Sequence, residues 1–306
     1  MTSRFEKYHG IIPAFYACYE EDGSVSAQRT RVFARHLVTK GVKGLYVCGS
    51  SGECIYLEKE ERMQILEAVM AEVGDECTVI AHVACNNTDE SCQLAAHAQS
   101  LGVDAIASIP PIYFRLPDHA IAAYWNAISA AAPKTDFIIY NIPQLAGVAL
   151  SLNLFNEMRK NPRIIGVKNS SMPTQDIQMF KHSGGDDCVV FNGPDEQFVA
   201  GRAIGADGGI GGTYAAMPEL FLKMDQLIRS GDASAACEIQ YAVNDIIGAM
   251  CQCKGNLYAV MKKILEIREG LLLGSVRLPL AELAPEDLGQ VKVCARMIDQ
   301  AIADYV

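Results

Sequence analysis

Ile164-Ile165-Gly166-Val167-Lys168-Asn169-Ser170-Ser171 is the stretch that decides the fold: apolar and small residues run into a lysine, and small polar residues follow. An apolar run of this length predicts a strand buried on both faces, and the polar residues after it predict a loop. A lysine at the end of such a strand is costly to desolvate unless it is deprotonated or paired. With a lowered pKa, Lys168 would be an amine nucleophile able to form a Schiff base with a carbonyl substrate. The alternative is a lysine whose ammonium group reaches solvent beyond the strand.

Short apolar runs of this kind recur along the chain, and a stretch with helical spacing follows most of them. The other predicted strands cover residues 10–16, 44–48, 78–83, 105–109, 137–140, 189–192 and 208–210. Helical spacing is found over residues 26–39, 58–71, 89–100, 119–131, 151–160 and 196–204. This alternation is typical of α/β proteins with a parallel sheet.

Eight strand signals with helices between them, within about 215 residues, predict a closed (β/α)8 barrel, the TIM-barrel fold. An open doubly wound sheet is the alternative, but Pro13 and Ala14 stand where its phosphate-binding glycines would be needed. After residue 218 the strand signals stop, and helical signals cover residues 220–228, 234–252 and 283–305, with a loop over 270–279. We therefore expect a catalytic barrel over residues 1–225 and a C-terminal helical extension over residues 226–306.

The composition disfavours several classes of partner. A formal net charge of −10 and a pI near 5.1 argue against nucleic acid and anionic membranes. No segment approaches the roughly 20 apolar residues that a membrane span needs, and residues 1–7 lack the apolar core of a signal peptide. Eleven cysteines without an export signal are typical of reduced thiols in a cytoplasmic protein. Cys251-Gln252-Cys253 is too tight for a zinc pair, and no histidine cluster accompanies it, so we expect no metal.

Polar residues follow several predicted strands, and in a (β/α)8 barrel the carboxyl ends of the strands form the functional face. Lys168 ends the sixth strand and Tyr140 ends the fifth, so the two lie on neighbouring strands at one rim. The other candidates that follow strands at this rim are Ser50 and Ser51, Tyr113, Asp195 and Glu196, and Gly211 and Gly212. The gathering of these candidates at one face favours a functional role for Lys168.

Two tyrosines of this rim could take part in the chemistry. Tyr140 is the best candidate for a general acid/base, and because a phenol titrates near pKa 10 it needs a nearby lysine or a relay to move protons quickly. The alternative for Tyr140 is a core tyrosine that makes one hydrogen bond. Tyr113 lies in a proline-stiffened loop after the fourth strand, where an interface role and a pocket role are equally open.

The turn Gly49-Ser50-Ser51-Gly52-Glu53 exposes backbone N–H groups and hydroxyls, which suits a bound carboxylate, although an ordinary turn between strand and helix would look the same. Asp195 and Glu196 could accept hydrogen bonds from substrate hydroxyls. The alternative for both is an acid at a helix N-terminus, where the helix dipole favours it. The lack of an Asp/His cluster disfavours a metal-dependent aldolase.

Four motifs together resemble the N-acetylneuraminate lyase and dihydrodipicolinate synthase superfamily, whose members are class I aldolases that handle pyruvate. They are Gly49-Ser50-Ser51-Gly52-Glu53, Tyr140-Asn141-Ile142-Pro143, Gly166-Val167-Lys168 and Gly205-Ala206-Asp207-Gly208-Gly209-Ile210. The chain is most similar to the lyase branch, because Leu145 stands where the synthase branch has an arginine for a second carboxylate. Gly193-Pro194-Asp195-Glu196 also resembles the lyase segment that binds the glycerol tail of the sugar.

The resemblance implies a role for each candidate and no cofactor, since the lysine itself forms the covalent Schiff base. Lys168 would form it, Tyr140 would move the proton, and Ser50 with Ser51 would hold the carboxylate. Ser170 would stand near the C4 hydroxyl, and Gly193, Asp195, Glu196, Gly211 and Gly212 would line the polyol pocket. Tyr113 resembles a tyrosine that such enzymes insert into a neighbouring subunit's site, which implies a homotetramer.

The implied reaction is the reversible cleavage of N-acetylneuraminate to pyruvate and N-acetylmannosamine. Another pyruvate-dependent aldolase or dehydratase, dihydrodipicolinate synthase included, and a non-catalytic sugar-acid-binding barrel remain as alternatives. Ser51 and Ser170 replace threonines of the resemblance and Gly212 replaces a frequent serine, which leaves the exact sugar acid and its stereochemistry open.

Overall fold

Eight parallel strands form the centre of the structure, a computed structural model that describes residues 5–306. Residues 1–4, part of the segment compared above with a signal peptide, lie outside the described residues. The strands are β1 (Gly10–Pro13), β2 (Gly44–Val47), β3 (Thr78–His82), β4 (Ala105–Ser108), β5 (Asp136–Asn141), β6 (Ile164–Asn169), β7 (Val189–Asn192) and β8 (Gly208–Gly211). β1 is shorter than predicted and ends at Pro13, and the side chains of Phe15 and Tyr16 pack in the layer between strands and helices.

The strands close into a ring. They follow one another in the order β1-β8-β7-β6-β5-β4-β3-β2. β1 and β2 complete the ring, because the Lys43 N–H donates to the Ile11 carbonyl at 2.8 Å and the Phe15 N–H donates to the Tyr46 carbonyl at 2.9 Å. An open sheet would leave these two edges unpaired. The predicted (β/α)8 barrel is therefore confirmed.

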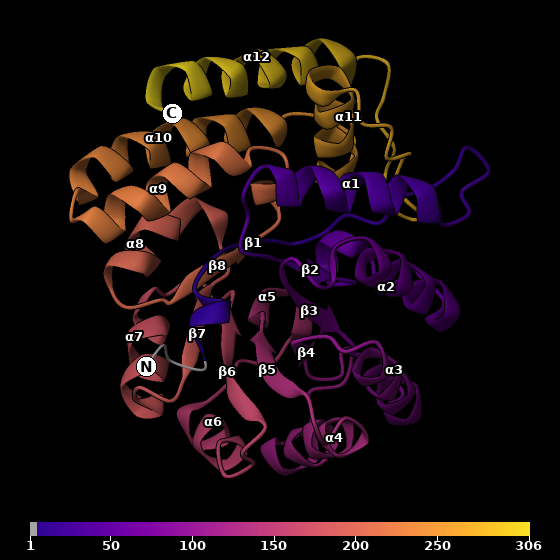
Figure 1. Cartoon of the computed structure of the whole chain (residues 1–306), viewed down its shortest axis with the longest axis vertical. Helices are drawn as coiled ribbons and strands as arrows, with labels where there is room; N and C mark the ends of the chain where they lie inside the picture. The colour runs from indigo at the N-terminus through magenta and orange to yellow at the C-terminus, as the bar shows by residue number, and fades with distance from the viewer. Residues whose placement is uncertain (1–4) are drawn as a thin grey trace.

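Helices surround the ring of strands (Figure 1). Their starts follow from capping residues: Ser26 accepts a hydrogen bond from the Arg29 N–H, and Asn87 accepts one from the Asp89 N–H. The helices around the barrel are α1 (Ala27–Thr39), α2 (Lys59–Val73), α3 (Thr88–Ser100), α4 (Asp118–Ala131), α6 (Leu152–Met158), α7 (Gln175–Gly184), α8 (Phe198–Ala203) and α9 (Pro218–Ser230), the last of which packs against β1. The short helix α5 (Pro143–Ala146) directly follows β5.

A β-bulge in β6 decides which way Lys168 points. β5 pairs with the residues on either side of Ile165 and skips Ile165 itself. After the bulge, Lys168 lies level with Tyr140, whose side chain packs in the barrel interior. Ile165 also packs in the interior, and side chains of a regular strand point alternately inward and outward. Without the bulge, Lys168, three residues further on, would therefore point outward. Gly166 permits the bulge, because a Cβ at that position would lie 1.8 Å from the carbonyl oxygen of Val189.

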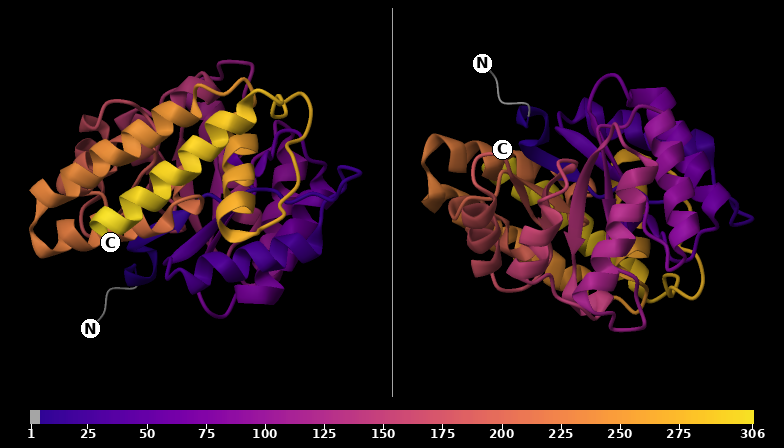
Figure 2. Two further views of the ribbon diagram at one scale, coloured as in Figure 1. Left: turned by 90° about the horizontal axis from the view of Figure 1, so that it is seen from above. Right: turned by 90° about the horizontal axis from the view of Figure 1, so that it is seen from below.

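The C-terminal extension consists of α10 (Ala233–Met250), α11 (Leu257–Glu269) and α12 (Asp287–Tyr305). α9, α10 and α12 pack side by side along one side of the barrel, as the orange and yellow helices of Figures 1 and 2 show. α11 lies close to the N-terminal helix α1 in Figure 1. The expected boundary between residues 225 and 226 falls inside α9.

α11 is absent from the sequence prediction. A buried lysine, Lys262, lies in the middle of this helix and interrupts the apolar stripe on which a helix prediction depends. The end signals are nevertheless present in the sequence. Asn256 accepts a hydrogen bond from the Tyr258 N–H at the start, and Gly270 ends the helix with φ +70°.

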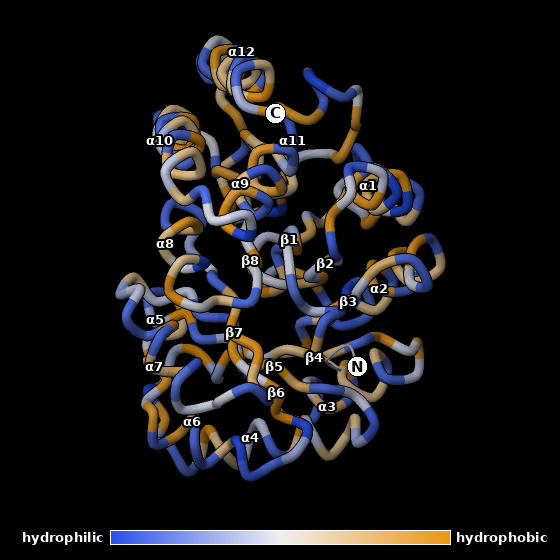
Figure 3. The backbone as a smooth tube through the Cα atoms, turned by 60° about the vertical axis from the view of Figure 1, so that its left-hand side comes forward, coloured by the Kyte–Doolittle hydropathy of each residue, from blue (hydrophilic) through white to orange (hydrophobic). Residues whose placement is uncertain are grey.

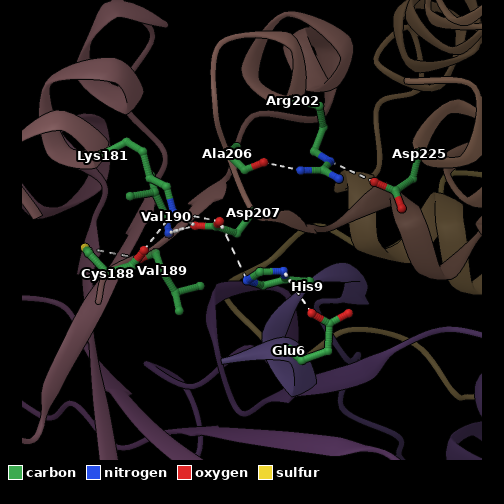
Figure 4. A network of polar contacts seen from close by, with 10 residues as sticks. All are labelled: Glu6, His9, Lys181, Cys188, Val189, Val190, Arg202, Ala206, Asp207 and Asp225. Carbon is green, nitrogen blue, oxygen red and sulfur yellow. Dashed lines mark hydrogen bonds and ion pairs between the residues drawn. The ribbon is translucent and has the colours of Figure 1, made fainter. Parts of the chain in front are cut away.

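The amino ends of the strands are held by ion pairs on the face opposite Lys168 (Figure 4). Asp207, directly before β8, accepts hydrogen bonds from the Val190 N–H at 2.8 Å and from the Lys181 ammonium group at 2.7 Å. Arg202 of α8 forms an ion pair with Asp225 of α9 at 2.7 Å. These contacts tie α7, α8 and α9 to the base of the barrel.

Two apolar layers make up the core. One fills the barrel interior, and the other lies between the strands and the surrounding helices. Figure 3 shows hydrophobic residues along the central strands and hydrophilic residues on the outer turns of the helices. Among the described residues, no helix has the length and apolar character needed to cross a membrane.

Candidate active site

Lys168 lies near the carboxyl end of β6 and is only 4% exposed. Its Nζ atom lies 3.7 Å from the ring centroid of Tyr140 and 4.6 Å from that of Tyr46. Burial lowers the pKa of Lys168 to about 7, while the negative charge of Asp195 acts in the opposite direction. A large share of the amine is therefore uncharged, and nucleophilic, at neutral pH.

Aromatic contacts hold the ring of Tyr140 beside Lys168. Its ring makes edge contacts with Tyr46 and His82, with both pairs of ring centroids 5.9 Å apart. Burial raises the pKa of Tyr140 to about 12, and the nearby hydroxyls of Ser50 and Ser170 oppose this rise. The structure thus places Ser50, a predicted rim residue, and Ser170, named only through the family resemblance, close to Tyr140.

The 49–53 turn, which connects β2 to the segment before α2, carries both predicted carboxylate ligands. Its centre is a 3-10 helix, Ser50–Gly52, in which Ser51 is buried and Ser50 is partly exposed. Gly212 lies opposite this turn, because a Cβ at Gly212 would lie 3.1 Å from the Ser51 hydroxyl and 3.8 Å from the ring of Tyr258. The absent side chain at Gly212 leaves room between the turn and α11.

Asp195 and two glycines form the other side of the site. The carboxylate of Asp195 accepts hydrogen bonds from the Thr213 N–H and hydroxyl, both at 2.7 Å. Burial raises the pKa of Asp195 to about 6, and the two bonds from Thr213 oppose the rise. A side chain at Gly211 would overlap Asp195, and one at Gly193 would overlap the Ser170 hydroxyl, so both glycines allow close approach of the strand ends.

Glu196 differs from Asp195, because its side chain is exposed. The backbone of both residues is held by α10: Gln240 donates to the Asp195 carbonyl and Asn244 donates to the Glu196 carbonyl, each at 3.1 Å. Both acids lie in the short 3-10 helix Asp195–Gln197. Both acids therefore lie at the start of a helix, as the alternative interpretation expects. The side chain of Asp195 is in addition directed toward the site.

Tyr113 lies at the surface, 88% exposed, rather than among the buried side chains around Lys168. Its backbone has a left-handed φ of +84°, and its ring packs edge-on against Phe114 with centroids 5.0 Å apart. It borders a separate cavity of about 700 Å³, together with Asn86, Thr88, Leu116 and Tyr124.

Three residues near the site were missed in the sequence. Tyr46 and His82 lie within predicted strands, and only the direction of their side chains, into the barrel, reveals their place beside Tyr140. His82 makes a 3.0 Å hydrogen bond through Nδ1 to the Cys48 carbonyl, and burial keeps the pKa of His82 well below its ordinary value. Tyr258 belongs to α11, so no predicted element contained it.

A cavity of about 670 Å³ opens at the same rim. It is lined in part by Ser50, Cys54, Arg62, Ile142, Leu145 and Tyr258. Leu145 is 65% exposed and presents an apolar side chain at the position that the family resemblance compares with an arginine. Within residues 5–306, no three His, Cys, Asp or Glu side chains come together in an arrangement that could hold a metal ion.

The sequence pattern of the dihydrodipicolinate synthetase family matches residues 7–298, nearly the whole chain. The chain belongs to this family. Within it, the chain is 63% identical to the N-acetylneuraminate lyase of Mediterraneibacter gnavus over 97% of this chain and 94% of that protein. It is 31% identical to the N-acetylneuraminate lyase of an Enterobacter species over 96% of this chain and 98% of that protein.

Solved structures show the same likeness within the family. A catalytic lysine mutant of the sialic acid aldolase from Ruminococcus gnavus superposes with a TM-score of 0.99 at 61% identity, and the match covers 100% of both chains. A dihydrodipicolinate synthase from Bacillus anthracis superposes with a TM-score of 0.89 at 22% identity, with 94% of this chain and 98% of that chain covered, which shows the shared barrel fold alone.

Proposed function

We propose that this chain is a class I aldolase that reversibly cleaves N-acetylneuraminate to pyruvate and N-acetylmannosamine. The observation that carries the proposal is a buried lysine, Lys168, with a pKa of about 7 and its amine 3.7 Å from the ring centroid of Tyr140. Similarity to proteins named N-acetylneuraminate lyase and sialic acid aldolase supports the choice of sugar acid.

The first half of the mechanism forms the covalent intermediate. The uncharged amine of Lys168 adds to the C2 carbonyl carbon of the open-chain sugar acid, giving a carbinolamine. The carbinolamine hydroxyl takes the phenol proton of Tyr140 and leaves as water, so an iminium cation and a phenolate remain side by side. The high pKa of Tyr140 makes a free phenolate costly, and the adjacent cation offsets that cost.

The second half breaks the carbon–carbon bond. The phenolate of Tyr140 takes the proton of the C4 hydroxyl, the C3–C4 bond breaks, and its electron pair moves into an enamine between C2 and C3. N-acetylmannosamine leaves as the aldehyde. Tyr140 returns the proton to C3, and water then releases pyruvate from Lys168, so no cofactor is required.

The remaining residues of the site bind the substrate. Ser50 and Ser51 hold the carboxylate through their hydroxyls and their own backbone N–H groups. The Ser50 hydroxyl also lowers the pKa of Tyr140, and we assign it a part in the proton transfer of that phenol. The residues assigned to the hydroxyl groups of the sugar are Ser170, Gly193, Asp195, Glu196, Gly211 and Gly212.

Assembly and compartment complete the proposal. Tyr113 and Phe114 form an aromatic pair at the surface. The 88% exposure of Tyr113 supports a contact with another subunit of a homotetramer. All eleven cysteines are free thiols, which supports a reducing, cytoplasmic location.

The test is trapping of the Schiff base. Incubation with pyruvate and borohydride should reduce the iminium and add the mass of the adduct to Lys168, and N-acetylneuraminate should release pyruvate. Lys168→Ala should abolish both signals while circular dichroism shows an intact fold. Turnover that survives in Lys168→Ala would refute the mechanism, and a panel of other sugar acids tests the specificity.

A further inference from the structure

Glu53 and Lys262 form a buried ion pair directly behind the 49–53 turn. The Lys262 ammonium group donates to Oε1 of Glu53 at 2.8 Å, and the two side chains are 1% and 0% exposed. The partners lie 209 residues apart in the chain, one at the end of the turn and the other on α11. The pair therefore joins the C-terminal extension to the proposed carboxylate site.

Each partner of the pair is held by further bonds. Oε2 of Glu53 accepts hydrogen bonds from the Tyr19 hydroxyl at 3.1 Å and from the Arg277 N–H at 2.7 Å. The Lys262 ammonium group also donates to the Ser275 carbonyl at 2.6 Å and lies 4.6 Å from the ring centroid of Tyr19. Both oxygens of Glu53 are thus bonded, so its side chain has a single position.

The position of Glu53 determines the shape of the turn. Its backbone is left-handed, with φ +56°, a conformation that residues with side chains rarely adopt. Its N–H donates to the Ser50 carbonyl at 3.0 Å, which closes the 3-10 helix that carries the two serines. A shift of the Glu53 carboxylate would therefore move Ser50 and Ser51.

α11 contacts the turn at a second point. Tyr258 lies four residues before Lys262, on the same face of the helix. Its ring borders the space above Gly212, next to the Ser51 hydroxyl, and it lines the cavity at the rim. One face of α11 thus lies against the turn both near Ser51, at its centre, and at Glu53, its end.

We propose that the Glu53–Lys262 pair positions the 49–53 turn for the substrate carboxylate, which makes α11 a part of the substrate site. The inference rests on the proposed function, which assigns Ser50 and Ser51 to that carboxylate. A buried ion pair adds little net stability compared with apolar residues of the same volume, whereas its directional bonds fix geometry. Glu53 and Lys262 are positioning residues, because they act through the serines.

The test compares two probes that differ only in the carboxylate. Pyruvate and its uncharged methyl ester both present a ketone to Lys168, and borohydride trapping at rising concentration gives an apparent dissociation constant for each. The variants are Glu53→Gln, Lys262→Met and the double substitution, which removes both charges together and leaves no lone buried charge. Lys263→Met is the matched control, because Lys263 is the next residue of α11 and forms a more exposed pair with Glu266 at 2.7 Å.

We expect the three pair variants to weaken pyruvate trapping by about tenfold, the loss of roughly one hydrogen bond to a charged group, with methyl pyruvate unaffected. Lys263→Met should trap both probes like the wild type. An equal loss for both probes overturns the inference, because the pair would then support only the fold. No loss for either probe also overturns it, because the pair would then not position the turn. Failure of the wild type to trap pyruvate would instead overturn the proposed function.

Discussion

Replacement of Gly166 by alanine tests whether the bulge in β6 sets the position of Lys168. The new Cβ would lie 1.8 Å from the carbonyl oxygen of Val189 and 2.7 Å and 2.9 Å from its carbonyl carbon and nitrogen. All three are backbone atoms of a neighbouring strand, so no side chain can move aside. Overpacking of a core costs about 1–3 kcal/mol, and a backbone clash belongs at the upper end of that range or beyond it.

We therefore expect Gly166→Ala to lose about 3 kcal/mol of unfolding free energy, which lowers Tm by roughly 5 °C at this chain length. The strand can relieve the clash only by shifting β6, and a displacement of about 1 Å of the lysine can cost roughly 100-fold in rate. Pyruvate trapping at Lys168 should fall accordingly.

The assays are thermal unfolding and borohydride trapping. Gly248→Ala in α10 is the matched control, because a methyl group at that position would meet no atom of another element within 4 Å, and alanine there should stabilise by about 0.5–1 kcal/mol. An unchanged Tm together with wild-type trapping in Gly166→Ala would refute the role assigned to the bulge.

The charges of the site and of the barrel base give three further predictions. Because the pKa of Lys168 is about 7 and only the deprotonated amine attacks, the trapping rate should rise with pH through about 7 and then level off; a midpoint near the ordinary lysine value contradicts the burial argument. Asp195→Asn should lower kcat/KM for the sugar acid by about tenfold and move this midpoint to lower pH, since the Asp195 charge raises the pKa of Lys168; steady-state kinetics with an unchanged midpoint would argue against it. Lys181→Met removes the ion pair with Asp207 at the opposite face, so denaturant unfolding should show a loss of about 1–3 kcal/mol, and pyruvate trapping should match the wild type.

Much of the candidate site could be predicted because it depends on chain order and local pattern. Lys168 and Tyr140 end adjacent strands, and parallel strands of a closed barrel bring their carboxyl ends to one rim. Ser50 and Ser170 meet the phenol of Tyr140 for the same reason. Tyr258 could not be found in this way, because α11 buries a lysine in its apolar face and its cap signals alone were too weak.

The sequence by itself determined the alternation of buried strands and capped helices, and with it the barrel and the rim on which the candidate residues gather. Local apolar runs and capping residues act over a few positions, so they can be read without knowing distant contacts. Only the tertiary structure decided that Lys168 faces inward, since one skipped residue in the pairing of β5 with β6 reverses the alternation. It alone also decided that Glu53 meets Lys262, because contacts across 209 residues depend on how the barrel closes and where α11 packs.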